Sequence, residues 1–372
     1  MTKSRDRTGI IAAVLLSAVL PAALALSVDR LDEDHPRFDV GDHLVYIPMA
    51  ESPGGPHPAP YCYRKLVPTL SWLLPIGTQS SFYLLTLLFL WGTGVVLYLV
   101  LRELGEDRFY ALAGVALFYS LNWGAKFLLY DFWLVDPALF FAGTLAVYAA
   151  LRGNSMGTAA AIALGVTAKE TAVFLLPLCY GIWAKRFVDL RAVRRILIVA
   201  IVPIAVFVLL HVFVPATGSF DIVAFFRAHG LPQLRESPLM RIRGATLGTW
   251  GVLVLGLAFF GGLERRDYAR ATLLFLIFVY LQPLVDRVLV FGFLGVIPLA
   301  TSGLRRLSTR FQLAPWMRVG YVAVPFVLLL TKGASYHPAS PEQRLLGLFL
   351  WSVVVFFALR RRHPRISPLP PS

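Results

Sequence analysis

Charge is scarce in this sequence. Asp, Glu, Lys and Arg make up 15% of its 372 residues, whereas 57% are hydrophobic. Soluble domains carry about 25% charged residues. A soluble chain of this length could not hide so much apolar surface, so we expect lipid to surround most of it. The low charge therefore argues against an ordinary soluble enzyme and favours an integral membrane protein.

Cysteine and the common catalytic signatures are also scarce. Cys62 in an expected loop and Cys179 in an apolar run indicate no disulfide framework. The sequence contains no Walker loop, dinucleotide-binding glycine motif, nucleophile elbow or metal-type Cys/His spacing. The formal net charge of +14 would raise the question of nucleic acid in a soluble protein. Here Lys and Arg gather in short loops between apolar runs, as the positive-inside bias requires, and no nucleic-acid partner is expected.

Apolar runs fill most of the chain. They lie near residues 9–27, 80–101, 109–123, 132–151, 156–184, 192–215, 245–262, 271–304, 317–331 and 345–360. The first run has features of a signal peptide, but its length and the later runs favour a retained helix. Lys169-Glu170 and Asp286-Arg287 each interrupt a run that is too long for one crossing, so we expect a break at each pair.

The runs predict an all-α polytopic bundle of about 10–12 full or partial spans, at ~20 residues per crossing. We expect one transmembrane domain over residues 1–372, without a separate soluble domain. With the N-terminus inside, the dense basic clusters fall on the inner side. These clusters are residues 102–108, 185–195, 264–270, 305–310 and 360–365. Both termini are then cytoplasmic in a plasma membrane, and the loops 28–79 and 216–245 face outward.

The stretch FDVGDHLVY in the first outer loop supplies a candidate base. If a helix begins at residue 39, Asp39, Asp42, His43 and Tyr46 share one of its faces. Asp42 could take a proton from a hydroxyl as a general base. It could instead cap the helix, although no Glu or Gln completes a capping box. Both interpretations stay open on these residues.

Charged residues also begin or interrupt apolar runs on the expected outer side. Ionisable residues at membrane depth mark a functional site by default. Lys169 and Glu170 could neutralise each other at a hinge, or Lys169 could bind a phosphate. Asp136 precedes Pro137, a pattern typical of a helix N-cap followed by proline. Asp131 lies at the outer mouth and has no such simple explanation.

Arginines supply further cations on the same side. Arg287 follows Asp286 at the start of a late helix, and its planar fork fits phosphate oxygens. Arg241 and Arg243, in the loop sequence LMRIRG, could bind phosphate or anchor the loop at the membrane surface. Arg64 in the first loop completes the set that we predict to bind phosphate.

Together these residues predict an outward-facing pocket with a carboxylate base opposite several cations. Such a pocket suits a substrate with an anionic head and an apolar tail, which a hydroxyl attacks. The cations would stabilise the phosphate as it leaves. The predicted pocket also includes Asp39, His43, Tyr46, Asp131, Asp136, Glu170 and Asp286.

An ordered set of short motifs resembles the GT-C superfamily of polytopic membrane glycosyltransferases, including its mannosyltransferases. The motifs are GDHLVY, YRKLVPTLSWLLP, VDPALFF, TAKETAVFLLP and DRVLVFGFLGVIP, within residues 1–304. The resemblance implies an inverting transfer from a polyprenyl-phosphate-linked sugar to a hydroxyl of a glycan, lipid or protein. It assigns the base to Asp42 and the donor phosphate chiefly to Arg287 and Lys169. Residues 305–372, with further helices and a basic tail, lie beyond the resemblance.

Some members of that superfamily bind a divalent metal through a paired-acid motif in the second outer loop. Asp131 and Asp136 are five residues apart here, about 140° around a helix. That spacing departs from a tight pair, so we assign no metal ligands, and dependence on a divalent metal stays open. The lipid-linked sugar is a substrate rather than a cofactor.

Two other classes compete with the transferase. A lipid or polysaccharide transporter could use the same buried charges along its path, and broken helices are typical of transporters. However, the two interruptions, TAKET and LVDRVL, do not resemble each other. A non-catalytic membrane scaffold would have no need for buried charged pairs on one face.

Overall fold

Helices account for nearly all regular structure in the computed structural model. The structure describes residues 6–121, 123–218, 222–225, 227, 246–280, 289–330, 349 and 351–356. In this part of the chain, the expected all-α architecture is found. A two-stranded sheet of four residues is the one addition among these residues.

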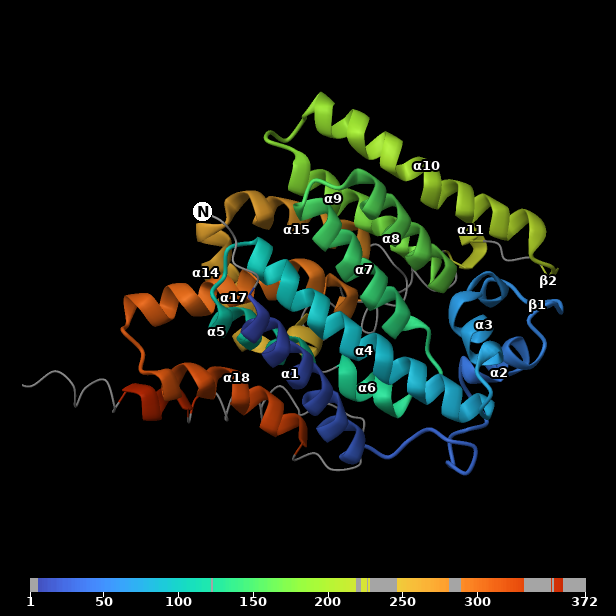
Figure 1. The fold of residues 1–372 in the computed structure, drawn as a ribbon, viewed down its shortest axis with the longest axis horizontal. Coiled ribbons are helices and arrows are strands. Elements are labelled where there is room, and N and C mark those ends of the chain that lie inside the picture. The colour runs from blue at the N-terminus through green and yellow to red at the C-terminus, as the bar shows by residue number, and fades with distance from the viewer. Residues whose placement is uncertain are drawn as a thin grey trace, which may run out of the picture.

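The first half of the chain builds a packed group of helices around α4 (Figure 1). Its members are α1 (Arg7–Leu26), α4 (Thr78–Glu103), α5 (Arg108–Tyr119), α6 (Ala125–Tyr130), α7 (Asp136–Leu151) and α8 (Ser155–Ala168). α4 contacts α1, α5 and α7, and α7 contacts α8. Short polar side chains start these helices: Asp6, Asp107 and Asn154 each accept a hydrogen bond from a backbone N–H of the first turn.

The second half adds further helices to this group. They are α9 (Leu175–Trp183), α10 (Leu190–Phe213), α11 (Ile222–Phe225), α14 (Gly248–Glu264), α15 (Arg266–Tyr280), α17 (Phe293–Arg310) and α18 (Pro315–Leu330). α14 and α17 approach each other closely at glycines. A Cβ atom on Gly303 would lie 1.9 Å from the Leu257 carbonyl oxygen, so this crossing requires glycine.

Four helices among the described residues are long and apolar enough to cross a membrane. They are α1, α4, α10 and the helical segment Val290–Arg310. Six further apolar helices are shorter, at 10–17 residues. The helix α10 exposes many large apolar side chains, among them Leu197, Ile201, Val208 and Val212. In water such a surface would be unfavourable, so these helices suit a lipid environment.

The apolar run interrupted at Lys169-Glu170 breaks as expected. It divides into α8 and α9, joined by the 3₁₀ helix η2 (Glu170–Phe174), with Lys169 extended between them. In the second run, the described residues up to Tyr280 lie in α15, and the residues from Val290 on lie in the short 3₁₀ helix η5 (Val290–Gly292) and in α17. The pair Asp286-Arg287 itself lies outside the described residues.

The first loop folds into a small unit at one end of the bundle, at the right of Figure 1. It contains α2 (His43–Glu51), β1 (His57–Pro58), η1 (Tyr61–Tyr63) and α3 (Leu66–Leu73). The strand β1 pairs in parallel with β2 (Ala216–Thr217), which follows α10. The two segments that the sequence predicts to face outward therefore touch each other.

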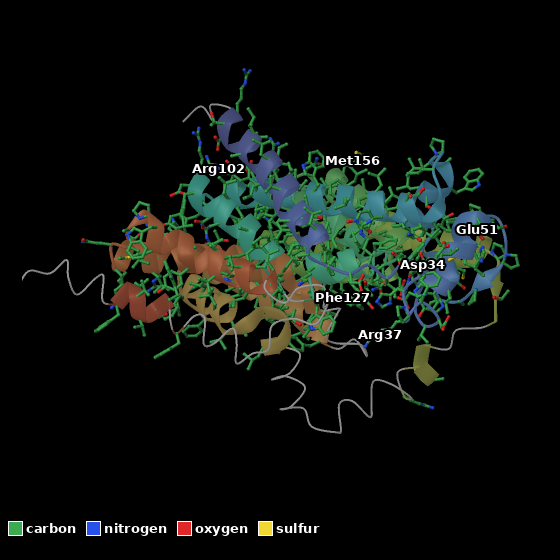
Figure 2. All side chains as sticks on the ribbon, turned by 90° about the horizontal axis from the view of Figure 1, so that it is seen from below. Asp34, Arg37, Glu51, Arg102, Phe127 and Met156 are labelled. Carbon is green, nitrogen blue, oxygen red and sulfur yellow. The ribbon has the colours of Figure 1, made fainter. Side chains whose placement is uncertain are left out.

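Basic clusters meet at the opposite end. Arg102 lies there in Figure 2, whereas Asp34 and Glu51 lie at the end formed by the first loop. Glu106, just after α4, is buried and pairs with Arg265 at 2.5 Å and Arg305 at 3.1 Å. Three of the predicted inner clusters thus converge on one carboxylate, in keeping with their assignment to a common side.

Candidate functional site

Arg64 ties the first loop to the helix break at Lys169-Glu170. Its Nε and Nη2 atoms donate to the two carboxylate oxygens of Glu170 at 3.0 Å and 2.7 Å. Its Nη1 atom donates to the Tyr46 hydroxyl at 2.9 Å. This fork-to-fork geometry is the strongest form of a carboxylate–guanidinium pair. The first loop is therefore held on the helical bundle by a charged contact.

A second ion pair lies beside the first. The Lys169 Nζ atom donates to Asp136 Oδ1 at 2.8 Å, and only 6% and 5% of the two side chains are exposed. Asp136 was expected as an N-cap, but Val135 occupies that position and Asp136 is the first helical residue. Because a buried ammonium is unfavourable without a counter-ion, the Asp136 carboxylate stabilises Lys169.

Lys169 and Glu170 each form an ion pair with a residue of another element, so mutual neutralisation, one of the two alternatives open from the sequence, is not the main contact of either. Each finds an opposite charge on a different element, because the chain is extended at Lys169 and enters η2 at Glu170. We name Asp42, Tyr46, Tyr61, Arg64, Asp136, Lys169 and Glu170 the ionic cluster. Its two ion pairs join two cations to two carboxylates, so their charges balance.

Asp42 lies at the edge of this cluster and is half-buried. It occupies the N-cap position of α2, but its side chain makes no capping hydrogen bond. Instead, Oδ1 accepts a hydrogen bond from the Tyr61 hydroxyl at 3.3 Å. The Tyr61 ring packs edge-on against Tyr46 and lies 4.9 Å beneath the Arg64 guanidinium. The capping role is thus not observed, and Asp42 is oriented by the cluster.

The electrostatics of the loop follow from this packing. Burial raises the pKa of Tyr46 above its usual range, and the nearby carboxylates of Asp42 and Asp136 raise it further. Burial opposes the charge on Arg64, but Tyr46 and Glu170 outweigh it and raise the pKa of the guanidinium. Tyr46 therefore stays a neutral hydrogen-bond partner, and Arg64 stays a cation.

Helix α2 begins at His43, so the helix expected from residue 39 is shorter than predicted. The chain turns at Gly41, with φ +155°, and Asp39 lies exposed before the helix. His43 is fully buried: its ring stacks on Phe38 at 4.3 Å, and its Nε2 atom bonds the Phe38 carbonyl at 2.5 Å. These contacts show that His43 stabilises the turn before α2.

Asp131 lies at the end of α6, at the base of the first loop. Next to it, the Tyr130 carbonyl accepts a hydrogen bond from the Leu31 N–H at 2.9 Å. The indole of Trp133 donates to the Leu31 carbonyl at 2.6 Å. Asp131 thus belongs to the surface on which the start of the first loop rests.

Two of the cations predicted to bind phosphate, Arg64 and Lys169, are already paired with carboxylates. A donor phosphate at either of them would compete with the carboxylate of Glu170 or Asp136 for the cation. Four other predicted residues lie outside the described part of the chain: Arg241, Arg243, Asp286 and Arg287. Their phosphate and pocket assignments stay predictions.

No group of three or more His, Cys, Asp or Glu side chains gathers around a common point among the residues that could be searched. Asp131 ends α6 and Asp136 begins α7, where it pairs with Lys169. The geometry therefore offers no argument for a metal in this part of the chain.

Tyr61 was not identified as a site residue from the sequence. Its neighbourhood, PYCYRK, contains aromatic residues next to Arg64, which is the signal that could have suggested it. The pairing of Tyr61 with Asp42, 19 residues earlier, depends on the loop's tertiary fold. Sequence spacing does not reveal such a contact.

No protein-family model matches this chain, and no curated protein is significantly similar to it in sequence. At the level of class, the described residues define a mostly helical protein, and four of their helices are long and apolar enough to cross a membrane. Its function must therefore be argued from the residues of the site.

Proposed function

We propose that the protein is a polytopic membrane glycosyltransferase of the GT-C type. It moves a sugar from a polyprenyl-phosphate donor to an acceptor hydroxyl at the outer face of the plasma membrane. The observation that carries this proposal is Asp42, which the Tyr61 hydroxyl orients at the edge of the ionic cluster. A half-exposed carboxylate on a rigid support is suited to act as a general base.

The reaction is a single displacement. Asp42 accepts the proton of the acceptor hydroxyl, and the acceptor oxygen attacks the anomeric carbon of the donor sugar. The bond between that carbon and the phosphate oxygen breaks, and polyprenyl phosphate leaves with the bonding electrons. One displacement inverts the anomeric configuration. Arg287, Arg241 and Arg243 are the proposed phosphate contacts, by sequence alone.

Arg64 and Lys169 have a supporting role in this proposal. The Arg64–Glu170 pair holds the first loop, and therefore Asp42, against η2. The Lys169–Asp136 pair holds the break between α8 and η2 against α7. A base must be held within a fraction of an ångström of its productive position, and such support keeps it there. This differs from the direct phosphate contact that the resemblance implies for Lys169.

The proposed topology has about 10–12 full or partial spans, with both termini cytoplasmic. It is supported by the four long apolar helices and by the basic clusters that meet around Glu106, away from the first loop. The shorter helices would be tilted or buried among their neighbours.

Release of the carrier tests the proposal. Purified protein in proteoliposomes would receive a mixture of polyprenyl-phosphate sugars and candidate acceptors, and free polyprenyl phosphate would be measured. Acceptor-dependent release supports a transferase. A transporter remains the second candidate, because α8 and α9 are separated by a break that carries buried charges. Donor movement across the bilayer without release would favour that alternative.

A further inference from the structure

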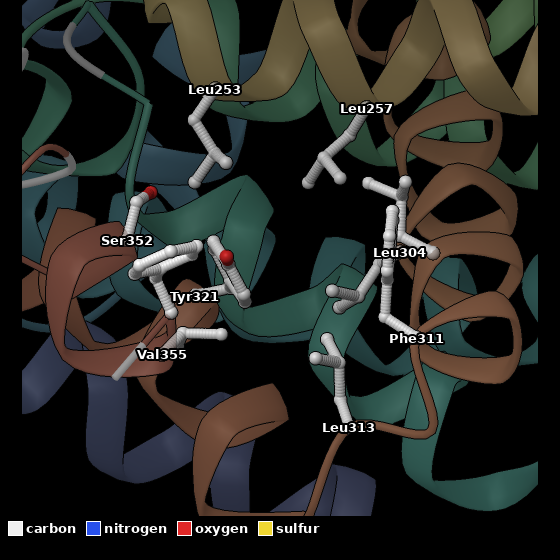
Figure 3. Close-up of a pocket in the computed structure, with 10 residues that line it drawn as sticks. Leu253, Leu257, Leu304, Phe311, Leu313, Tyr321, Ser352 and Val355 are labelled. Atoms are coloured by element: carbon white, nitrogen blue, oxygen red, sulfur yellow. The ribbon is translucent and has the colours of Figure 1, made fainter. Parts of the chain in front are cut away.

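An apolar cavity lies at a seam between α14, α17, α18 and the short helical segment 351–356 (Figure 3). Its volume is about 240 Å³. Its wall includes Leu253, Leu257, Leu304, Leu313, Tyr321 and Val355. This cavity is lined by residues that take no part in the ionic cluster.

The cavity separates two hydrophobic clusters. Leu257 and Leu304 belong to the main core, whereas Leu313 and Val355 belong to a small cluster of their own with Met317. Protein interiors are normally packed as densely as organic crystals. Apolar cavities of about 150 Å³ stay dry and bind benzene or xenon. A larger apolar seam is therefore suited to an apolar guest.

The surface around the cavity is also apolar. The segments that border the cavity expose Val252, Phe311, Trp316, Val319, Val354 and Phe356, of which Phe311 and Phe356 line the cavity itself. In a membrane this surface meets hydrocarbon, so lipid chains are the apolar molecules present at the cavity mouth. Exposed Trp316 suits the boundary between hydrocarbon and headgroups.

Arginines lie close in sequence to several of the cavity residues. Residues 305–330 include four arginines and no Asp or Glu. Arg305 pairs with Glu106 and Glu264. The Arg318 Nε atom donates to the carbonyl of the cavity residue Leu313 at 2.8 Å, which ties Arg318 to the cavity wall. Arg310 ends α17 next to the cavity residue Phe311.

We propose that this cavity holds one acyl chain of an anionic phospholipid, whose headgroup binds Arg310 and Arg318. Basic pockets between membrane helices bind anionic headgroups in this way. The apolar walls provide affinity for the chain, and the arginines, without a carboxylate in residues 305–330, provide the preference for negative charge. The site does not depend on glycosyl transfer.

Native mass spectrometry tests the proposal. The full chain, in micelles with equal amounts of phosphatidylglycerol and phosphatidylcholine of the same acyl chains, should retain about one phosphatidylglycerol per protein. Leu257→Phe, which fills the cavity, should lower retention several-fold. The double variant Arg310→Gln, Arg318→Gln should lose the preference for phosphatidylglycerol. Arg191→Gln, an exposed arginine at the start of α10, is the matched control and should retain the preference.

A second variant that fills the cavity keeps the test valid if Leu257→Phe fails to fold. Ser352→Phe enters the cavity from the opposite wall, on a different segment, and should also lower retention. Melting temperatures would identify variants that fail to fold. Equal retention of the two lipids by the wild type overturns the headgroup assignment. Undiminished retention in both folded filling variants, or no retained lipid in the wild type, overturns the acyl-chain site.

Discussion

Arg64 and Glu170 are 106 residues apart in sequence, yet two nitrogen–oxygen contacts of 3.0 Å and 2.7 Å join their side chains. The pair fixes the first loop to the point where an apolar run breaks into α8 and α9. Arg64 belongs to the first loop, and Glu170 belongs to η2 in the helical bundle. The position of Asp42 therefore depends on a contact that neither element makes alone.

Removing Arg64 should destabilise the protein. Arg64→Gln leaves the Glu170 carboxylate without its fork, and we expect a loss of about 3 kcal/mol. This value is at the lower end of the stability loss that follows when a buried ion pair loses one partner, because 32% of the Glu170 side chain is exposed. Arg64→Lys should recover only part of the loss, because an ammonium cannot make the same paired contacts. Thermal unfolding in detergent checks this. Equal stability of Arg64→Gln and the wild type would contradict it.

The pair of Lys169 and Asp136 makes a different prediction. Lys169→Met alone should destabilise the protein by about 3–5 kcal/mol, because it leaves Asp136 buried without that cation. The double variant Lys169→Met, Asp136→Leu should recover much of that stability. Thermal unfolding in detergent of the wild type, Lys169→Met and the double variant provides the comparison.

Donor affinity separates the two roles of Lys169. If Lys169 only joins the break after α8 to α7, the stable double variant should bind a polyprenyl-phosphate sugar nearly as well as the wild type. A large loss of donor affinity in a well-folded double variant would instead show that Lys169 contacts the phosphate, as the resemblance implies.

Tyr61 should influence the rate through Asp42. Tyr61→Phe removes the hydrogen bond to Asp42 but keeps the ring beneath Arg64. We expect a fall in kcat of about fivefold, equivalent to about 1 kcal/mol, with little change in KM. Tyr63→Phe is the matched control, because the Tyr63 ring stacks on His211 rather than meeting Asp42. Equal effects of the two substitutions would refute the positioning role of Tyr61.

A methyl group at the crossing of α14 and α17 should lower the stability of the protein. In Gly303→Ala, the new Cβ atom would lie 1.9 Å from the Leu257 carbonyl oxygen, so the helices must separate. Overpacking of this kind typically costs about 1–3 kcal/mol. Gly256→Ala on α14 is the control, because no atom lies within 4 Å of its new Cβ. Similar melting temperatures of the two variants would argue against this close crossing.

Much of the helical architecture could be predicted from the sequence. The apolar runs predicted α1, α4, α10 and most of the shorter helices, because runs of this composition need a non-aqueous surrounding. The charged pair at Lys169-Glu170 predicted the break between α8 and α9. The predicted start of α2 was wrong by four residues. The chain turns at Gly41, and the stacking of His43 on Phe38 stabilises that turn.

The partners within the ionic cluster could be predicted only in part. The sequence indicated that carboxylates and cations gather near Asp42. It could not show that Arg64 pairs with Glu170 and that Lys169 pairs with Asp136. These pairs span 106 and 33 residues, and their choice depends on how the first loop folds back. Local spacing carries information about one helix face, not about which distant charge lies opposite it.

The most direct test of the proposed base is the carrier-release assay applied to Asp42→Asn and, as a control, to Asp34→Asn. Asp34 is an exposed carboxylate of the same loop, so the control makes the same chemical change nearby. We predict a fall in release of about 10²-fold or more for Asp42→Asn at unchanged melting temperature, and no change for Asp34→Asn. Wild-type release from a well-folded Asp42→Asn variant would contradict the assignment of Asp42 as the base.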